Sequence, residues 1–180
     1  MPTSLTIESP SFSDQFVISC GTVTLDLQLG KALLIQWNKN GEILLPKGRK
    51  NIGESLYDAA LRETLEETGY EATLLPLLVG TLSTPTTTDD IDHGTGTQPP
   101  HTEPIAVNQR FSPNKQLKIV FWFAAQADST QPRQTGLQQE DEDFEPLWTP
   151  VGEVDQTLTF SEDRQIAQKV TDSARHLINE

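Results

Sequence analysis

The fold prediction for this chain depends most on one stretch, Gly48-Arg-Lys-Asn-Ile-Gly-Glu-Ser-Leu-Tyr-Asp-Ala-Ala-Leu-Arg-Glu-Thr-Leu-Glu-Glu-Thr-Gly-Tyr70. From residue 54 to residue 68 it is rich in alanine, leucine and glutamate and contains no proline, which predicts a helix ending at Gly69. At about 100° per residue, Glu63, Glu66 and Glu67 fall within an arc of roughly 100° on this helix. Such a row of like charges is either an ordinary solvated face or a site for a hard divalent cation, which takes oxygen ligands.

The other side chains of this helix predict how it packs. We expect an apolar side that includes Tyr57, Leu61 and Leu65 to lie on a sheet, with Asp58 and Arg62 on the opposite side. The three glutamates then lie at the edge of the buried face. Repulsion among their charges is stronger when they are buried, and a bound cation would offset this repulsion.

The rest of the chain alternates between predicted strands and polar loops. Runs rich in β-branched and apolar residues predict strands at 16–26, 32–37, 43–45, 71–83, 117–127 and 144–148, of which 117–127 is the most apolar and is expected to be central. Asn40-Gly41 predicts a tight turn between the second and third of these strands. A last helix is expected from a cap at Ser161 to about residue 177. We expect a flexible tail over 1–14 and one α/β domain over 15–180, with loop insertions at about 84–114 and 128–143.

Composition excludes several classes of protein. The 180 residues have a net charge of −13, which argues against a general nucleic-acid binder, since phosphate backbones are held by surplus lysine and arginine. No stretch approaches the roughly 20 apolar residues of a membrane span. The single cysteine, Cys20, lies in an apolar run and is expected to be a core residue. No secretory signal is recognisable, so a cytoplasmic or nuclear protein is expected.

The spacing of the opening stretch resembles the Nudix box, G-x5-E-x7-R-E-U-x-E-E-x-G-U, in which U is a bulky aliphatic residue. Seven residues fall in register: Gly48, Glu54, Arg62, Glu63, Glu66, Glu67 and Gly69. Thr64 and Tyr70 depart from the pattern, both at packing positions. Residues 20–23 also resemble the first core strand of the family, and residues 148–153 its C-terminal segment. The resemblance implies an α/β/α sandwich with a mixed β-sheet.

The resemblance also implies metal-dependent hydrolysis of a diphosphate linkage, by in-line attack of water at phosphorus. Glu63 and Glu67 are the expected ligands of Mg²⁺ or Mn²⁺, and the Gly48 carbonyl is a candidate third ligand. Glu66 is either a further ligand or the general base. Arg62 and Glu54 are expected to orient the loop and the helix.

Further polar residues are candidates for the same site. An additional carboxylate outside the box often assists in this family, and the candidates are Glu103, Glu140, Glu142 and Glu145. Lys47, Arg49 and Lys50 form a basic cluster around Gly48, which suits a substrate with several phosphates. Lys118, Lys115 and Arg110 are further phosphate contacts to consider. Trp37 and Trp122 either stack on a base or pack in the core, and packing is the commoner role of a strand tryptophan.

The expected partner is a small, phosphate-rich molecule, and the oligomeric state is not predicted. The run Leu-Pro-Lys-Gly that ends at Gly48 and the segment Phe-Trp-Phe-Ala at 121–124 resemble hydrolases of diadenosine polyphosphates and of diphosphoinositol polyphosphates. Hydrolysis of ADP-ribose or oxidised nucleotides and a non-catalytic binding module are the alternatives. A Nudix-fold isomerase is disfavoured, since it needs a catalytic cysteine and Cys20 lies early in the chain, in an apolar setting.

Overall fold

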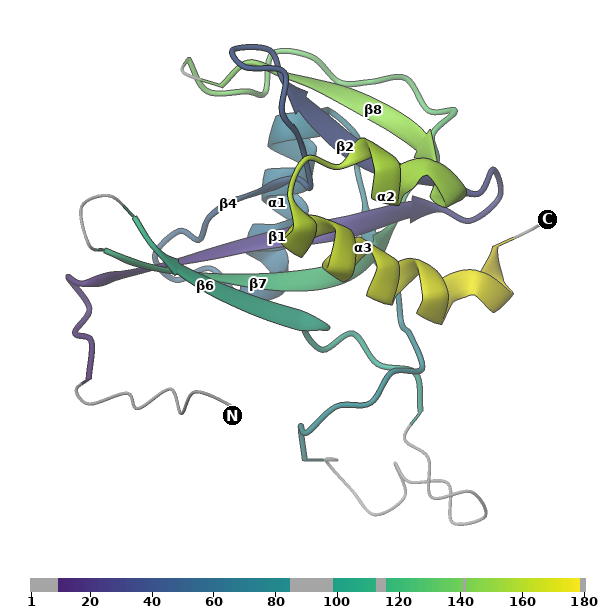
Figure 1. Cartoon of the computed structure of the whole chain (residues 1–180). Coiled ribbons are helices and arrows are strands. Elements are labelled where there is room, and N and C mark those ends of the chain that lie inside the picture. The colour runs from purple at the N-terminus through teal and green to yellow at the C-terminus, as the bar shows by residue number, and fades with distance from the viewer. Residues whose placement is uncertain (1–9, 85–98, 113–115, 141, 179–180) are drawn as a thin grey trace.

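The computed structural model of the chain describes residues 10–84, 99–112, 116–140 and 142–178 (Figure 1). The strands are β1 (Phe16–Asp26), β2 (Lys31–Trp37), β3 (Ile43–Leu44), β4 (Lys47–Arg49), β5 (Thr73–Leu74), β6 (Ala106–Phe111), β7 (Leu117–Gln126) and β8 (Phe144–Pro150). The α-helices are α1 (Leu56–Thr68), α2 (Val154–Thr157) and α3 (Ser161–Ala174), and 3-10 turns lie at Val151–Glu153 and Arg175–Leu177. Among these helices none has the length and apolarity to cross a membrane.

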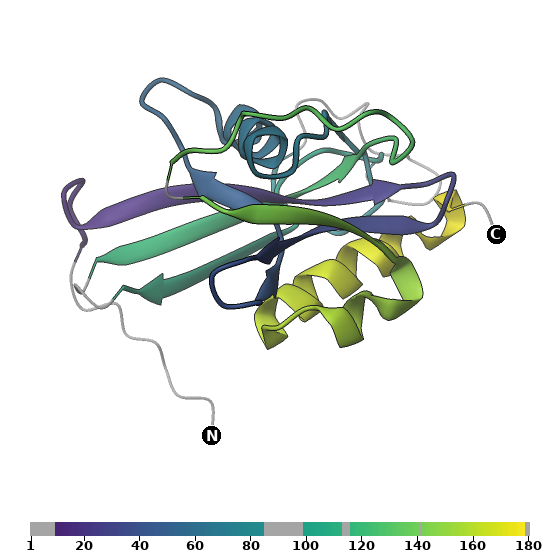
Figure 2. The same cartoon turned by 90° about the horizontal axis from the view of Figure 1, so that it is seen from above.

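All the strands belong to one mixed sheet. β1 runs parallel to β7 from the pair Phe16–Leu117 to the pair Leu25–Gln126, and antiparallel to β2 and β4. β7 pairs with β5 and β6 on its other side, so it lies inside the sheet as predicted. Helix α1 covers one face of the sheet, and α2 and α3 cover the other (Figure 2). The α/β/α sandwich with a mixed sheet is therefore confirmed.

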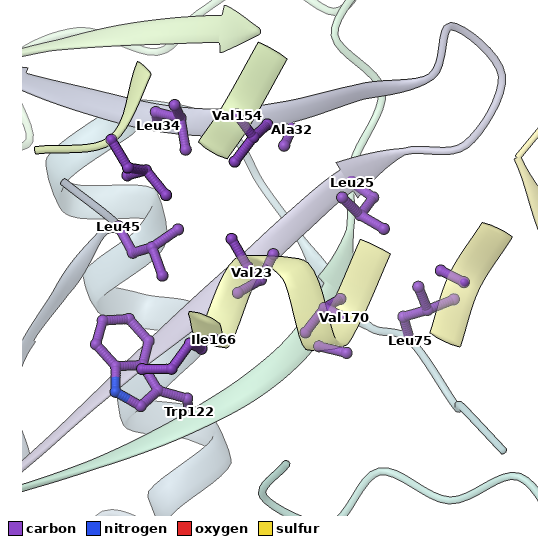
Figure 3. Close-up of a cluster of buried hydrophobic side chains, with 14 of the residues drawn as sticks. Val23, Leu25, Ala32, Leu34, Leu45, Leu75, Trp122, Val154, Ile166 and Val170 are labelled. Atoms are coloured by element: carbon purple, nitrogen blue, oxygen red, sulfur yellow. The ribbon is translucent and has the colours of Figure 1, made fainter. Parts of the chain in front are cut away.

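The larger core lies between the sheet and the C-terminal helices. Trp122 and Val23 of the sheet pack there with Ile166 and Val170 of α3 (Figure 3). A smaller cluster under α1 contains Cys20, which is fully buried. Because burial disfavours the thiolate, the pKa of Cys20 is raised to about 11, in agreement with a core role.

Helix α1 ends at Thr68 as predicted, begins at Leu56 instead of residue 54, and buries a face that is shifted toward the glutamates. Ser55 caps its N-terminus by accepting from the Asp58 amide, and Gly69 ends it at φ 78°. Tyr57, expected on the sheet, is 49% exposed. The buried residues are Ala59, Ala60, Glu63, Thr64, Glu67 and Thr68.

The departure of Thr64 from the aliphatic residue of the Nudix box has a physical reason. The Thr64 hydroxyl lies 2.6 Å from that of buried Thr22 on β1 and bonds the Ala60 carbonyl at 2.8 Å. Two hydroxyls that share a hydrogen bond can be buried where a single one would cost free energy.

Three local predictions are wrong. The expected strand 71–83 is reduced to Thr73–Leu74, because Pro76 lacks a donor for the ladder, and the remainder makes an isolated bridge from Leu77 to His101. The expected loop 84–114 contains β6, which pairs with β7. Ser161 is the first residue of α3 and does not cap it; Phe160 holds the cap position without a side-chain bond. Residues 1–9 of the expected tail, 85–98 and 113–114 of the first expected loop and 141 of the second lie outside the described residues.

Candidate active site

Two glutamates of α1 meet a third from a distant loop. Glu63 and Glu67, one turn apart on the buried face of α1, are 4% and 3% exposed. Glu142 belongs to the polar segment before β8. One carboxylate oxygen from each of the three lies within 4.8 Å of the others. We call this group the carboxylate cluster.

The carboxylate cluster has the chemistry of a divalent-cation site. Burial raises the pKa of Glu67 to about 8 and also raises the pKa of Glu63, because a carboxylate loses hydration in the interior. Three acidic oxygens held together repel one another unless a cation lies among them, and hard divalent cations take such oxygen ligands. The residues therefore fit a divalent metal ion.

Two backbone features of β4 hold the cluster in place. The Lys47 amide donates to Glu67 Oε2 at 2.7 Å. A Cβ atom at Gly48 would overlap the Glu63 carboxylate, so glycine at this position leaves the space that the carboxylate occupies. The glycine of the box thus makes room for the Glu63 side chain between β4 and α1.

Arg62 connects the helix to the loop before it. Its Nε and Nη2 donate to the two oxygens of Glu54 at 2.7 and 3.1 Å, and Nη1 donates to Glu63 at 2.7 Å and to Glu66 at 2.8 Å. Nη2 also donates to the Arg49 carbonyl at 2.8 Å. Hydrogen bonds from Arg62 lower the pKa of Glu54. Every nitrogen of the guanidinium is bonded to the protein, which makes Arg62 a positioning residue in this structure.

Glu66 lies outside the carboxylate cluster. The sequence placed Glu66 on one face with Glu63 and Glu67, and Arg62 on the opposite side. Instead Arg62 pairs with both Glu63 and Glu66, and the Glu66 carboxylate is not part of the cluster. Of the carboxylates considered outside the box, only Glu142 is in the cluster. Glu145 pairs with Arg133 at 3.0 Å, and Glu103 accepts from Ser83 at 3.1 Å. Glu140 is exposed and is not among the cluster residues.

Four cations gather on neighbouring strands. Arg110 of β6 lies opposite Lys118 of β7 in the ladder. Burial, together with the charges of Lys47, Arg110 and Arg49, lowers the pKa of Lys118 to about 8. Lys50 does not join them, since its Nζ donates to the Asn51 carbonyl. Lys115 lies outside the described residues.

A cleft of about 430 Å³ lies beside these cations. Its lining combines three aromatic residues with two cations and three acids: Trp37, Phe144, Phe160, Lys47, Arg110, Glu42, Glu162 and Asp163. Trp122 is not part of it; it is buried and its indole N–H donates to Asn108. Phe144, Phe160 and Asp163 were not predicted as site residues, although Phe144 follows Glu142 by two residues and Phe160 immediately precedes a predicted helix.

The cleft and the carboxylate cluster are adjacent. Lys47 lines the cleft while its amide bonds Glu67. Glu142 belongs to the cluster, and Phe144, two residues later, lines the cleft. Lys47 and the segment from Glu142 to Phe144 therefore connect the cleft with the carboxylate cluster.

Comparison with known proteins places the chain in a family. The model of the NUDIX domain matches residues 17–170. Similar solved structures include a Nudix-family hydrolase from Clostridium perfringens, at 19% identity over 86% of this chain and 95% of that chain with a TM-score of 0.58. A C. elegans Ap4A hydrolase in a binary complex shares 17% identity over 89% and 98% of the two chains, with a TM-score of 0.58. A MutT Nudix hydrolase from Burkholderia pseudomallei shares 20% identity over 87% and 99%, with a TM-score of 0.54.

A search of curated proteins finds no match. The structural likenesses, all at low identity, show the fold. The family model covers most of the chain, and the fold and the box agree with it. This chain belongs to the Nudix family and is a Nudix pyrophosphohydrolase.

Proposed function

We propose that this enzyme hydrolyses dinucleoside polyphosphates, with diadenosine polyphosphates as the first substrates to test. The observation that carries the proposal is the lining of the cleft, in which Trp37, Phe144 and Phe160 accompany only two cations. Flat aromatic side chains suit a nucleobase, which stacks on them with a gain of about 1–3 kcal/mol per base.

The same lining disfavours a diphosphoinositol polyphosphate. Such a substrate carries phosphates around its ring and needs a basic surround, whereas Glu42, Glu162 and Asp163 outnumber Lys47 and Arg110 in the cleft. The sequence left these two substrate classes open. The balance of charge in the cleft supports the dinucleotide.

We propose Mg²⁺ or Mn²⁺ as the metal, held by Glu63, Glu67 and Glu142 with the Gly48 carbonyl as a further ligand. When bound, the cation neutralises charge that develops on the bridging and leaving oxygens of the diphosphate. In this proposal Lys47, Arg49, Arg110 and Lys118 bind the remaining phosphates, and Lys50 helps only if it leaves the Asn51 carbonyl.

Glu66 is the proposed general base, which takes a proton from the attacking water. Its side chain is 28% exposed, so water can reach it, and Arg62 fixes its position. Glu142 is the alternative base because it lies within the carboxylate cluster. In either case the role of Arg62 is to orient the glutamates.

The test is product analysis by mass spectrometry with Mg²⁺ or Mn²⁺, across diadenosine tetraphosphate, a diphosphoinositol polyphosphate, ADP-ribose and nucleoside triphosphates including an oxidised one. We expect the diadenosine compound to have the highest kcat/KM. Reaction in ¹⁸O-labelled water identifies the phosphorus that is attacked. Preferred cleavage of any other member, or tight binding of all without turnover, would refute the proposal.

A further inference from the structure

Asp163 has an unusual position for a charged residue. It lies in the first turn of α3, is only 7% exposed, and yet lines the cleft. Carboxylates are rarely buried without a partner, because the charged form loses hydration. Burial accordingly raises the pKa of Asp163.

Among the described residues, only one oxygen of this carboxylate accepts a hydrogen bond. Oδ2 accepts a long hydrogen bond of 3.3 Å from the Leu45 amide. Among the described residues no hydrogen bond to Oδ1 is found, and no lysine or arginine forms an ion pair with Asp163. Oδ1 therefore has no donor among the described residues, on a residue that lines the cleft and whose charged form is favoured by the nearby charges of Lys47 and Arg110.

Two hydrogen bonds connect the segment before Asp163 to β3. The Thr159 amide donates to the Ile43 carbonyl at 2.9 Å, and the Ile43 amide donates to the Thr159 hydroxyl at 2.8 Å. These bonds fasten the start of α3 to β3, and with it Phe160, an aromatic residue of the same cleft. The acceptor and the aromatic surface lie side by side on backbone that these hydrogen bonds hold. Such an arrangement can recognise the edge of a stacked ring by a hydrogen bond.

We propose that Asp163 is a specificity-determining residue whose Oδ1 accepts a hydrogen bond from an N–H donor on the edge of the nucleobase in the cleft, such as the exocyclic amino group of adenine. The proposal rests on the proposed function, because it requires a nucleobase in the cleft. A site built to bond a donor disfavours a ligand that lacks one, since the bound ligand then displaces water from the acceptor without replacing its hydrogen bond.

The test compares two substrates in the unchanged enzyme. One is diadenosine tetraphosphate, and the other is its analogue in which hydrogen replaces each 6-amino group, so that the ring offers no donor at that edge. We expect kcat/KM to be about 10- to 100-fold lower for the analogue, mainly through KM, because the base lies away from the reacting phosphorus. Equal kcat/KM values for the two substrates would overturn the proposal.

Variants then assign the effect to a residue. Asp163→Asn keeps the shape and an acceptor for Leu45, and we expect it to bring the ratio of the two kcat/KM values close to one. Glu162→Gln is the matched control, because Glu162 lines the same cleft and is exposed, and it should leave the ratio unchanged. Thermal unfolding of both variants checks that they are folded.

The outcomes separate this inference from the proposed function. If the enzyme cleaves diadenosine tetraphosphate and Asp163→Asn keeps the discrimination, the role of Asp163 is refuted and the proposed function stands. If the unchanged enzyme cleaves neither dinucleotide, the proposed function fails, and the assignment of Asp163 fails with it.

Discussion

Glu67 should stabilise the enzyme only when a metal is bound. In the metal-free protein its pKa is about 8 because of burial, against an ordinary value of 4.5. The folded state therefore binds the proton more tightly than the unfolded state, and the free energy of unfolding falls as the pH rises from 4.5 to 8. At about 1.4 kcal/mol per pH unit, the destabilisation above pH 8 is on the order of 5 kcal/mol.

Glu67→Gln removes this charge but keeps an acceptor for the Lys47 amide. A buried amide group also costs some free energy. We therefore expect the free energy of unfolding of the variant in EDTA to exceed that of the unchanged protein by at least about 2 kcal/mol at pH 8, and by little at pH 4.5. The same variant should lose nearly all metal-dependent hydrolysis and most of the stabilisation by Mg²⁺ or Mn²⁺.

The assay is urea unfolding at both pH values, with EDTA and with added metal. Glu66→Gln is the control, since Glu66 is partly exposed and paired with Arg62, so its loss should not stabilise the metal-free protein. If Glu67→Gln is no more stable than the unchanged protein in EDTA at pH 8, the argument that this charge is buried without compensation is wrong.

Three further predictions concern neighbouring residues. Gly48→Ala should lower metal affinity at least about 10-fold in calorimetric titration, because the new Cβ displaces the Glu63 carboxylate; unchanged affinity would contradict the close packing of β4 on α1. Since the pKa of Lys118 is about 8, KM for a polyphosphate should rise above pH 8 as this cation is lost, and Lys118→Arg should keep KM low to higher pH; a profile that the variant does not alter would exclude the role. Phe144→Ala should raise KM for a dinucleotide about 10-fold in steady-state assays. KM for inorganic pyrophosphate should not change, because pyrophosphate has no base; equal effects on both KM values would argue against stacking.

Local patterns in the sequence account for much of the fold. The ends of β1, the start of β7 and the end of α1 agree with the predictions, since Gly69 and runs of β-branched residues act through neighbouring backbone. β6 was not predicted because half of its residues (Asn108, Gln109 and Arg110) are polar and it is stabilised by pairing with β7. Tyr57 was assigned to the wrong side because polar Glu63 and Glu67 occupy part of the buried face, and helical periodicity of apolar residues cannot reveal that.

The sequence by itself determined the family, the helix that carries the glutamates, and the glycine at which β4 meets it, because all of these depend on fixed spacings within one short segment. Only the tertiary structure decided that Glu142 completes the carboxylate cluster, that Glu66 turns to Arg62, and that Asp163 lies at the wall of an aromatic cleft. These contacts join residues far apart in the chain. Their partners are set by how the strands pair and how the loops return over the sheet, which no local pattern specifies.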